Sequence, residues 1–481
     1  MTMDNASFEF VAFGLAVAIV SNFSRSRIWR SAVLLAASLI FLGLLAGHPR
    51  VLLPLLGFLL LGYAGLYLLQ RGIAKSAMWS ILAVIFVYIW LKQYTFLPQG
   101  IFLRAPYLTL GLSYIFFRVL HLLIETGDGA QKQRVGPFAY LMYCLNFTTL
   151  ISGPIQRYED FAEDQFAAEP VPLGVRVTGL QLERIIRGFF KVNVMALLLH
   201  AFQVDALEQL THPYAPLQLR LWAALRLAIL YPFFLYCNFS GYMDIVIAIA
   251  RLMRLRLPEN FNRPFAASSC IDFWNRWHMT LSNWLKTYVY NPLLITLMGR
   301  FSSLAVQQFL GIVCFFVTFF LIGVWHGRTS EFVFFGVLTG AGMSVNKLWQ
   351  LAMVRVLGRK GYKKLAENWV YLAFGRGLNF VWFAFTFFWF GYSWRQIDRM
   401  ASDLSVTQWL LVWLAIWLCG TFALTAWEKL RSWLLSFKTA EGPVITSRYA
   451  LVVYATALGL AAVVINILLH QPAPAIVYKA F

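Results

Sequence analysis

Two histidines each follow a tryptophan in a chain that is otherwise very apolar. His278 ends the sequence RWH, inside a polar stretch from Asn260 to Pro292, and His326 lies forty-eight residues later in VWHGRT. Histidine is the side chain best able to accept and return a proton near neutral pH. Burial disfavours the charged ring, so a buried histidine stays neutral and able to act as a base. The two positions are therefore candidates for proton transfer.

Acyl transfer from a thioester to a hydroxyl is one reaction that such residues could serve. It needs a base for the hydroxyl proton and hydrogen-bond donors for the oxyanion that develops. A dry, apolar surrounding suppresses competing hydrolysis. His326 stands between two long apolar runs, which suits a base. A histidine in a membrane helix also commonly forms a hydrogen bond between helices, and spacing alone leaves both roles open.

Other chemistries have weaker support in the sequence. It contains no GxSxG nucleophile motif, no HExxH zinc motif, no P-loop and no dinucleotide-binding glycine pattern. The five cysteines are scattered without CxxC or Cys/His ligand spacing, so we expect neither a disulfide framework nor a metal site.

Aromatic and polar residues alternate at helical spacing around His278. This pattern predicts a tryptophan-rich amphipathic helix from Ile271 to Tyr290, at the membrane interface or at the rim of a helical bundle. The two histidine motifs and this helix supply our candidate substrate-binding residues, which are Asp272, Asn275, Arg276, Trp277, Tyr288 and Trp325.

The elements that must position these residues are membrane helices. Hydrophobic residues make up 60% of the 481 positions and charged residues only 13%, about half the charged fraction of soluble proteins. Apolar runs of about 20 residues recur and are continuous, which favours helices over barrel strands. We predict an all-α, polytopic membrane protein with about 11–12 transmembrane helices. The short run 138–153 ends in Ser-Gly-Pro and is predicted to be re-entrant.

The net charge of +19 has two compatible explanations. Basic loops mark the cytoplasmic side of a multi-pass protein. A basic cytoplasmic face would also attract an anionic donor, such as the phosphates of coenzyme A or an acidic carrier protein. The basic segments near residues 254 and 360 place His326 away from the cytoplasm or deep in the protein.

Three further ionisable residues lie within apolar segments. Arg118 and His121 share one helix face, and they either face the bundle interior or extend to the cytoplasmic interface. For Asp244 we favour a structural role, as a hydrogen-bond acceptor or as a partner of Arg251 or Arg254.

Several segments together resemble the membrane-bound O-acyltransferase family. The resemblance is to the bacterial branch with alginate O-acetylases and the D-alanyl transferase of teichoic-acid modification, and it covers roughly residues 105–400. The matching segments are GLSYIFFRVLHLLIE (111–125), LISGPIQRYEDF (150–161), YCNFSGYMDIVIAIARLMRLRLPENFNRPF (236–265), DFWNRWHMTLSNWLKTYVYNPL (272–293) and VWHGRTSEFVFFGVLTG (324–340).

The resemblance implies a funnel-shaped helical bundle around a thinned membrane. It implies that His326 is the essential catalytic base and that His278 is a second active-site or tunnel residue. The whole chain, 1–481, would form one integral-membrane domain, with N-terminal helices in 1–105, the family core in 106–400 and C-terminal helices in 401–481.

The resemblance also implies that the protein works in the bacterial cytoplasmic (inner) membrane. We expect it to contact membrane lipid and not to bind nucleic acid. We expect transfer of an acyl group from a cytoplasmic thioester of coenzyme A or an acyl-carrier protein. Acetyl is the acyl group that we favour. This donor is a substrate, and we expect no permanently bound cofactor. The acceptor would be a hydroxyl of an exported polysaccharide or of an SGNH-type partner transferase. The alternatives are D-alanyl transfer from a carrier protein, a proton-coupled transporter and a non-enzymatic scaffold.

Two positions depart from the pattern of that branch. NPLLITLMGR (291–300) stands where a Pro-Leu-Gly-Gly turn is usual, on the side expected to meet the donor. Arg328, Thr329 and Ser330 follow the second histidine motif, where Pro-Thr or Ala-Thr is more usual. We therefore expect donor and acceptor contacts to differ in detail.

Overall fold

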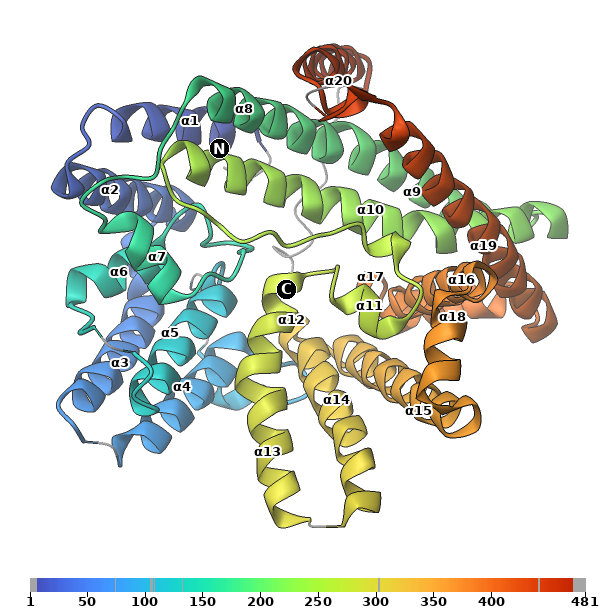
Figure 1. Cartoon of the computed structure of the whole chain (residues 1–481), viewed down its shortest axis with the longest axis horizontal. Helices are drawn as coiled ribbons and strands as arrows, with labels where there is room; N and C mark the ends of the chain where they lie inside the picture. The colour runs from blue at the N-terminus through green and yellow to red at the C-terminus, as the bar shows by residue number, and fades with distance from the viewer. Residues whose placement is uncertain are drawn as a thin grey trace. The chain divides into compact units, whose positions relative to one another are not determined.

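The computed structural model describes residues 7–469, except 74, 104–106, 108, 132, 302 and 440–441. Helices dominate this part of the chain (Figure 1). Within the described residues the strands are β1 (Lys438–Thr439) and β2 (Gly442–Pro443), which pair antiparallel as a short hairpin. The prediction of an all-α protein is confirmed.

Eight described helical segments are long and apolar enough to cross a membrane, which confirms a polytopic membrane protein. They are Arg27–Ala46, Pro49–Gln70, Val175–Thr211, Leu217–Leu252, Phe309–His326, Trp369–Gly391, Val406–Ser436 and Arg448–Leu468. Two shorter apolar helices are α1 (Phe8–Ser21) and α4 (Ser76–Lys92).

The predicted number of 11–12 spans exceeds the eight found among the described residues. The prediction also counted α5 (Leu112–Gly127), which has 16 residues, and the first part of α15 (Ser330–Glu367), where Gly, Ser, Thr and Asn interrupt the apolar residues. The run predicted to be re-entrant contains α6 (Pro137–Leu145), with 9 residues. At 1.5 Å per residue α6 is about 14 Å long, too short to span.

Within the described part of the chain, the first of two compact units comprises residues 7–189 and 241–259. Its remaining helices are α2 (Arg27–Ala46), η1 (Pro49–Leu52), α3 (Leu53–Gln70), η2 (Gln99–Ile101), α7 (Tyr158–Gln165), α8 (Val175–Phe190) and the end of α10 (Leu217–Leu252). In Figure 1 the helices α3, α4 and α5 lie side by side, and all three pairs are in contact.

Arg118 and His121 both face the interior of the first unit, with 2% and 1% of their surfaces exposed. The Arg118 guanidinium donates to three backbone oxygens between residues 143 and 149 and to the Thr149 hydroxyl, at 2.5–2.9 Å. His121 Nε2 accepts the backbone N–H of Tyr158 at 3.1 Å. The interior alternative is therefore confirmed, and Arg118 satisfies carbonyls that the end of α6 leaves without helical partners.

Asp244 is a buried hydrogen-bond acceptor, which was one of the two predicted alternatives, and the arginines beside it belong to α8. It accepts a hydrogen bond from Arg184 Nε at 2.9 Å and lies 3.5 Å from Arg187 Nε. Both arginines belong to α8, whose backbone is adjacent to α10. Arg251 and Arg254 instead donate to backbone oxygens elsewhere in the unit.

The second unit comprises residues 190–240 and 260–474. Its elements are η3 (Lys191–Ala196), α9 (Leu197–Thr211), the start of α10, η4 (Pro264–Ala266), α11 (Cys270–Trp274), α12 (Met279–Leu285), η5 (Lys286–Tyr290), α13 (Asn291–Arg300), α14 (Leu304–His326), α15, α16 (Trp369–Thr386), α17 (Phe388–Gly391), α18 (Trp394–Ser402), α19 (Val406–Ser436), η6 (Val444–Thr446) and α20 (Arg448–Leu469).

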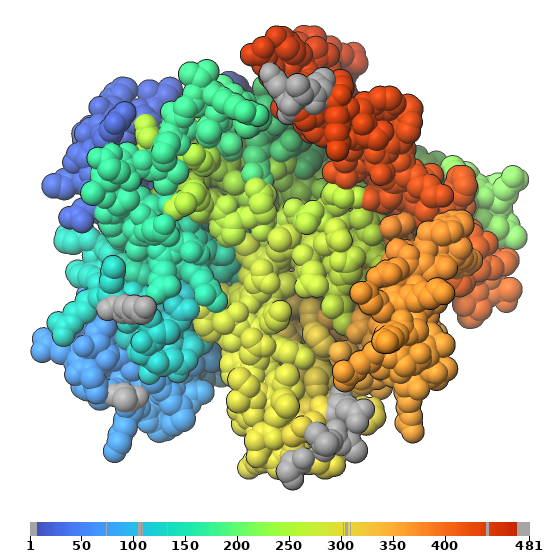
Figure 2. Space-filling view, viewed as in Figure 1, coloured from blue at the N-terminus to red at the C-terminus, as the bar shows by residue number. Residues whose placement is uncertain are grey.

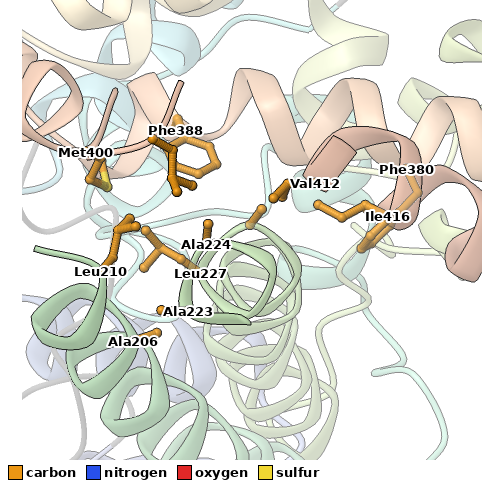
Figure 3. Packing of buried hydrophobic residues seen from close by; sticks show 12 residues of the cluster. Ala206, Leu210, Ala223, Ala224, Leu227, Phe380, Phe388, Met400, Val412 and Ile416 are labelled. Atoms are coloured by element: carbon orange, nitrogen blue, oxygen red, sulfur yellow. The ribbon is translucent and has the colours of Figure 1, made fainter. Parts of the chain in front are cut away.

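A buried apolar cluster joins α9 and α10 to the helices that follow α15. Figure 3 shows Ala223 of α10 beside Ala206 of α9, Leu227 of α10 beside Leu210 of α9, and Phe388 of α17 on the other side of the same cluster. The alanines are small and allow α9 and α10 to pack closely. The cluster holds α17, which supplies part of the site described next.

Candidate active site

The chain turns sharply at His278, immediately before α12. His278 has φ 45° and ψ 49°, in the left-handed region, so α11 and α12 are separate short helices. A five-residue π-helix, η5, follows α12. The predicted continuous amphipathic helix from Ile271 to Tyr290 is therefore wrong. Residues 260–262 explain the break, because they pair with the backbone at the turn.

Two backbone hydrogen bonds fasten this turn. The N–H of Met279 donates to Asn260 O at 3.0 Å, and the N–H of Asn262 donates to Arg276 O at 2.9 Å. These bonds hold residues 276–279 in a tight turn where helical hydrogen bonds would otherwise form. Periodicity along 271–290 could not reveal them, since the partner lies upstream.

Asn260 also fixes the His278 ring. Its Oδ1 accepts the Thr280 backbone N–H at 3.1 Å and the Thr280 hydroxyl at 2.8 Å, and it lies 3.3 Å from His278 Nδ1. A carbonyl oxygen can only accept, so Nδ1 carries the hydrogen and Nε2 of the neutral ring carries the lone pair. Both residues are fully buried, and burial lowers the pKa of His278 to about 3. His278 is therefore neutral near pH 7.

His326 is the last residue of α14, and its ring centroid lies 6.1 Å from that of His278. Only 3% of its surface is exposed. Aromatic rings surround it, with centroid separations of 4.8 Å to Trp325, 5.1 Å to Phe390 and 6.1 Å to Phe335. The structure thus brings together the two histidines selected from the sequence, in an apolar setting that strengthens electrostatic interactions.

Glycines allow α14 and α15 to approach closely at this end. A Cβ at Gly323 would lie 2.3 Å from the Cα of Gly336 on α15. A Cβ at Gly327, directly after His326, would lie 1.9 Å from the Phe332 ring. The glycine of the WHG motif therefore provides space for a ring that packs, at 5.3 Å, against Phe390. Phe390 in turn contacts His326.

Trp277 and Trp325 lie beside the histidines. Trp325 is 8% exposed, and its ring centroid is 6.2 Å from that of His278. Trp277 is 2% exposed and stacks on Phe273, with ring centroids 5.4 Å apart. Trp325 therefore contacts both histidine rings, and Trp277 packs among aromatic rings next to His278 in the chain.

The other predicted binding residues lie on the outer side of the loop or beyond it. Asn275 is exposed, and Asp272 forms a partly exposed ion pair with Arg276 at 2.8 Å. Tyr288 lies in η5, half-buried against Trp284. Asn275 is exposed and Asp272, Arg276 and Tyr288 are partly exposed, whereas the two histidines are buried.

Sequence reasoning missed Asn260 and the rings of Phe239, Phe335 and Phe390. Phe239 packs edge-on against His278 with ring centroids 5.0 Å apart. Asn260 was visible in NFNRPF, eighteen residues before His278, but no spacing rule connects it to the ring. The phenylalanines had no signal that distinguished them from the 43 in the chain.

Known proteins resemble this chain across the site. The sequence profile of MBOAT, the membrane-bound O-acyltransferase family, matches residues 74–374. A teichoic acid D-alanyltransferase of Bacillus subtilis is 28% identical over 281 residues, which cover 58% of this chain and 68% of the relative. One from Streptococcus thermophilus is 31% identical, covering 54% and 62%. The Probable alginate O-acetylase AlgI of Pseudomonas syringae pv. tomato is 31% identical, covering 50% and 43%.

The chain spans less than half of that alginate O-acetylase and just under two thirds of the Streptococcus relative. The family match is broader, since it covers more than half of this chain and includes both histidine motifs. The chain belongs to the membrane-bound O-acyltransferase family.

Proposed function

We propose that this O-acyltransferase moves an acetyl group from a cytoplasmic thioester to a hydroxyl of an exported cell-envelope polysaccharide or of a partner transferase, in the bacterial inner membrane. The observation that carries the proposal is the pair His278 and His326, buried together with ring centroids 6.1 Å apart. Two proton-accepting rings in an aromatic enclosure suit acyl transfer, because water is excluded while a base stays available.

His326 acts as the base in this proposal. A ring nitrogen takes the acceptor hydroxyl proton as the oxygen attacks the thioester carbonyl carbon. The new C–O bond forms, the C–S bond breaks, and the proton passes from the imidazolium to the departing thiolate. A base of this kind typically contributes about 10²–10⁴-fold to the rate.

His278 is the second active-site residue. The Asn260 hydrogen bond turns its Nδ1–H away and makes Nε2 the acceptor. An acceptor at that position suits the orientation of a hydroxyl or of the imidazolium that forms on His326. Trp277 and Trp325 enclose the transferred group, and Asn275, Arg276 and Tyr288 contact the donor farther out, where Asp272 positions Arg276 through their ion pair.

D-alanyl transfer from a carrier protein is the second candidate. One observation favours it, because the two D-alanyltransferase relatives align over 281 and 268 residues and the alginate O-acetylase over 243. The histidine chemistry is the same for both acyl groups. Only the product distinguishes them.

The test is to identify the ester that the chain forms. Cells that express the chain, the His326→Ala variant or no chain are grown in parallel, and esters of the envelope polymers are released by mild alkali and analysed by mass spectrometry. We expect acetate that depends on the chain and disappears with His326→Ala at equal membrane abundance. D-alanine in place of acetate would select the second candidate, and ester that persists in the variant would contradict the role of His326.

A further inference from the structure

Four arginines gather around the loop that leads to His278. Arg263 belongs to this loop, Arg276 begins the turn at residues 276–279, and Arg376 and Arg431 come from α16 and α19. Figure 2 shows the yellow-green surface of this part of the second unit bordered by orange and red surface, and η4 contacts both α16 and α19. The cluster therefore combines residues from three distant segments.

Hydrogen bonds hold two of these arginines in place. Arg276 donates to Asp272 Oδ1 at 2.8 Å and to Asn262 O at 3.5 Å. Arg376 Nε donates to Ala266 O at 3.1 Å. These bonds use only part of each guanidinium, which has five N–H donors.

Arg263 is the centre of the cluster. It has φ 50°, a left-handed conformation rare for a residue with a side chain, and forms an ion pair with Glu428 of α19. Burial and the positive charges of Arg431, Arg276 and Arg376 lower its pKa. The side chains of Arg263 and Arg276 remain 38% and 29% exposed, so a ligand can reach them.

The charges in this cluster do not balance. Arg263 pairs with Glu428 and Arg276 pairs with Asp272, whereas Arg376 and Arg431 add their charges without an ion pair among the described residues of this cluster, which leaves an excess of two positive charges. Like charges held together repel each other, and a bound anion relieves the repulsion. Guanidinium groups are well suited to phosphate, because their planar N–H pairs bind two oxygens at once.

We propose that Arg263, Arg276, Arg376 and Arg431 form a binding site for the phosphate of the thioester donor. The inference rests on the proposed function, since coenzyme A and the phosphopantetheine arm of a carrier protein both carry phosphate. Arg276 lies two residues before His278, on the exposed side of the turn whose buried side presents that histidine. The basic residues Arg254, Arg256 and Arg263 follow the pattern of a cytoplasmic segment, which is the side on which the donor arrives in this proposal.

The proposal predicts that substitutions of the carboxylates and of the arginines change phosphate affinity in opposite directions. Glu428 and Asp272 compete with a phosphate for Arg263 and Arg276. Glu428→Gln or Asp272→Asn should therefore tighten phosphate binding, whereas Arg263→Gln or Arg276→Gln should weaken it. Arginines with a purely structural role would lose fold stability in all four variants and show no opposite effect on binding.

The experiment measures the Kd for coenzyme A and for 4′-phosphopantetheine on the detergent-purified full chain carrying His326→Ala, which holds donor binding apart from turnover. We expect Arg263→Gln and Arg276→Gln to weaken binding about tenfold each, as expected for a charge-assisted hydrogen bond, and Glu428→Gln to strengthen it severalfold. Arg395→Gln removes the same charge at an exposed position of α18 and is the control, with unchanged Kd expected.

Anionic lipid is the other source of phosphate at such a place. Nanodiscs of phosphatidylcholine are therefore compared with nanodiscs of phosphatidylglycerol. Arginine-dependent stabilisation by phosphatidylglycerol together with absent binding of coenzyme A and phosphopantetheine would overturn the donor assignment. Equal Kd values for Arg263→Gln, Arg276→Gln and the control would overturn the site itself. Neither result concerns His326, whose role is tested separately by ester formation.

Discussion

Asn260 Oδ1 lies 3.3 Å from His278 Nδ1 and also accepts two hydrogen bonds from Thr280. The amide oxygen therefore assigns the ring hydrogen to Nδ1, and the lone pair of the neutral ring to Nε2. A single buried side chain thus sets both the orientation and the tautomer of a candidate active-site histidine.

Asn260→Leu should lower kcat about tenfold or more, because His278 and Thr280 lose a buried acceptor. Asn260→Asp keeps the acceptor but adds a negative charge, which favours protonated His278 and raises its pKa. The acid limb of the pH–rate profile should therefore move to higher pH in the aspartate variant. Thr280→Ser, which retains both donors, is the control. An unchanged profile in Asn260→Asp would show that the amide does not act through the ring.

His278 should make the protein less stable in acid. Its pKa is about 6.5 when unfolded and lowered to about 3 in the fold, so below pH 6.5 the unfolded chain binds a proton that the folded chain does not. Stability is retained above pH 6.5 and falls as pH decreases toward 3, by up to about 1.4 kcal/mol per pH unit. His278→Asn, with a side chain that tolerates the left-handed conformation, should reduce the pH dependence of Tm between pH 7 and 5. Equal slopes for the two proteins would contradict this.

Gly327→Ala should disturb His326 directly, because the added Cβ would lie 1.9 Å from the Phe332 ring. We expect acyl transfer to fall at least tenfold, since overpacking of this size costs about 1–3 kcal/mol. Phe332→Leu in the same chain should restore part of the activity by making space. Gly299→Ala is the control, as a Cβ at Gly299 meets no atom within 4 Å. Full activity of Gly327→Ala would exclude tight packing as the reason for this glycine.

Asp244→Asn should lower stability and leave the chemistry intact. The change weakens the buried pair with Arg184, although Arg184 keeps Glu259 at 2.6 Å. We expect a loss of about 1–3 kcal/mol, less than for a pair with no second partner. Thermal unfolding in detergent and kcat at a permissive temperature measure the two effects. A lost kcat without lost stability would show that Asp244 takes part in catalysis.

The sequence predicted most of what depends on composition and local order. Hydrophobic runs identified an all-helical membrane protein, and the RWH and WHG motifs singled out two histidines that the fold places together. The interior position of Arg118 was among the alternatives, because a charge within an apolar helix needs buried acceptors. The family membership excludes the transporter and scaffold alternatives as the main function.

Features that depend on distant partners could not be predicted. The helix expected across 271–290 breaks at His278 because Asn260 and Asn262 bond to the turn from upstream. Asp244 accepts a hydrogen bond from Arg184 of α8, which lies sixty residues earlier in the chain. The arginine cluster required α16 and α19 to meet the loop at η4. Each of these contacts joins segments that are far apart in the sequence, and the periodicity of hydrophobic residues within one segment carries no information about such contacts.

The most direct measurement is the rate at which labelled acetyl groups pass from acetyl-coenzyme A to envelope polymer in membrane vesicles that contain the wild-type chain, His326→Ala or His200→Ala. His200, an exposed histidine of α9, is the matched control. If His326 is the base, its variant should be slower by about 10²–10⁴-fold, while His200→Ala transfers at the wild-type rate. A His326→Ala rate within a few-fold of wild type, at equal protein abundance, would contradict the account.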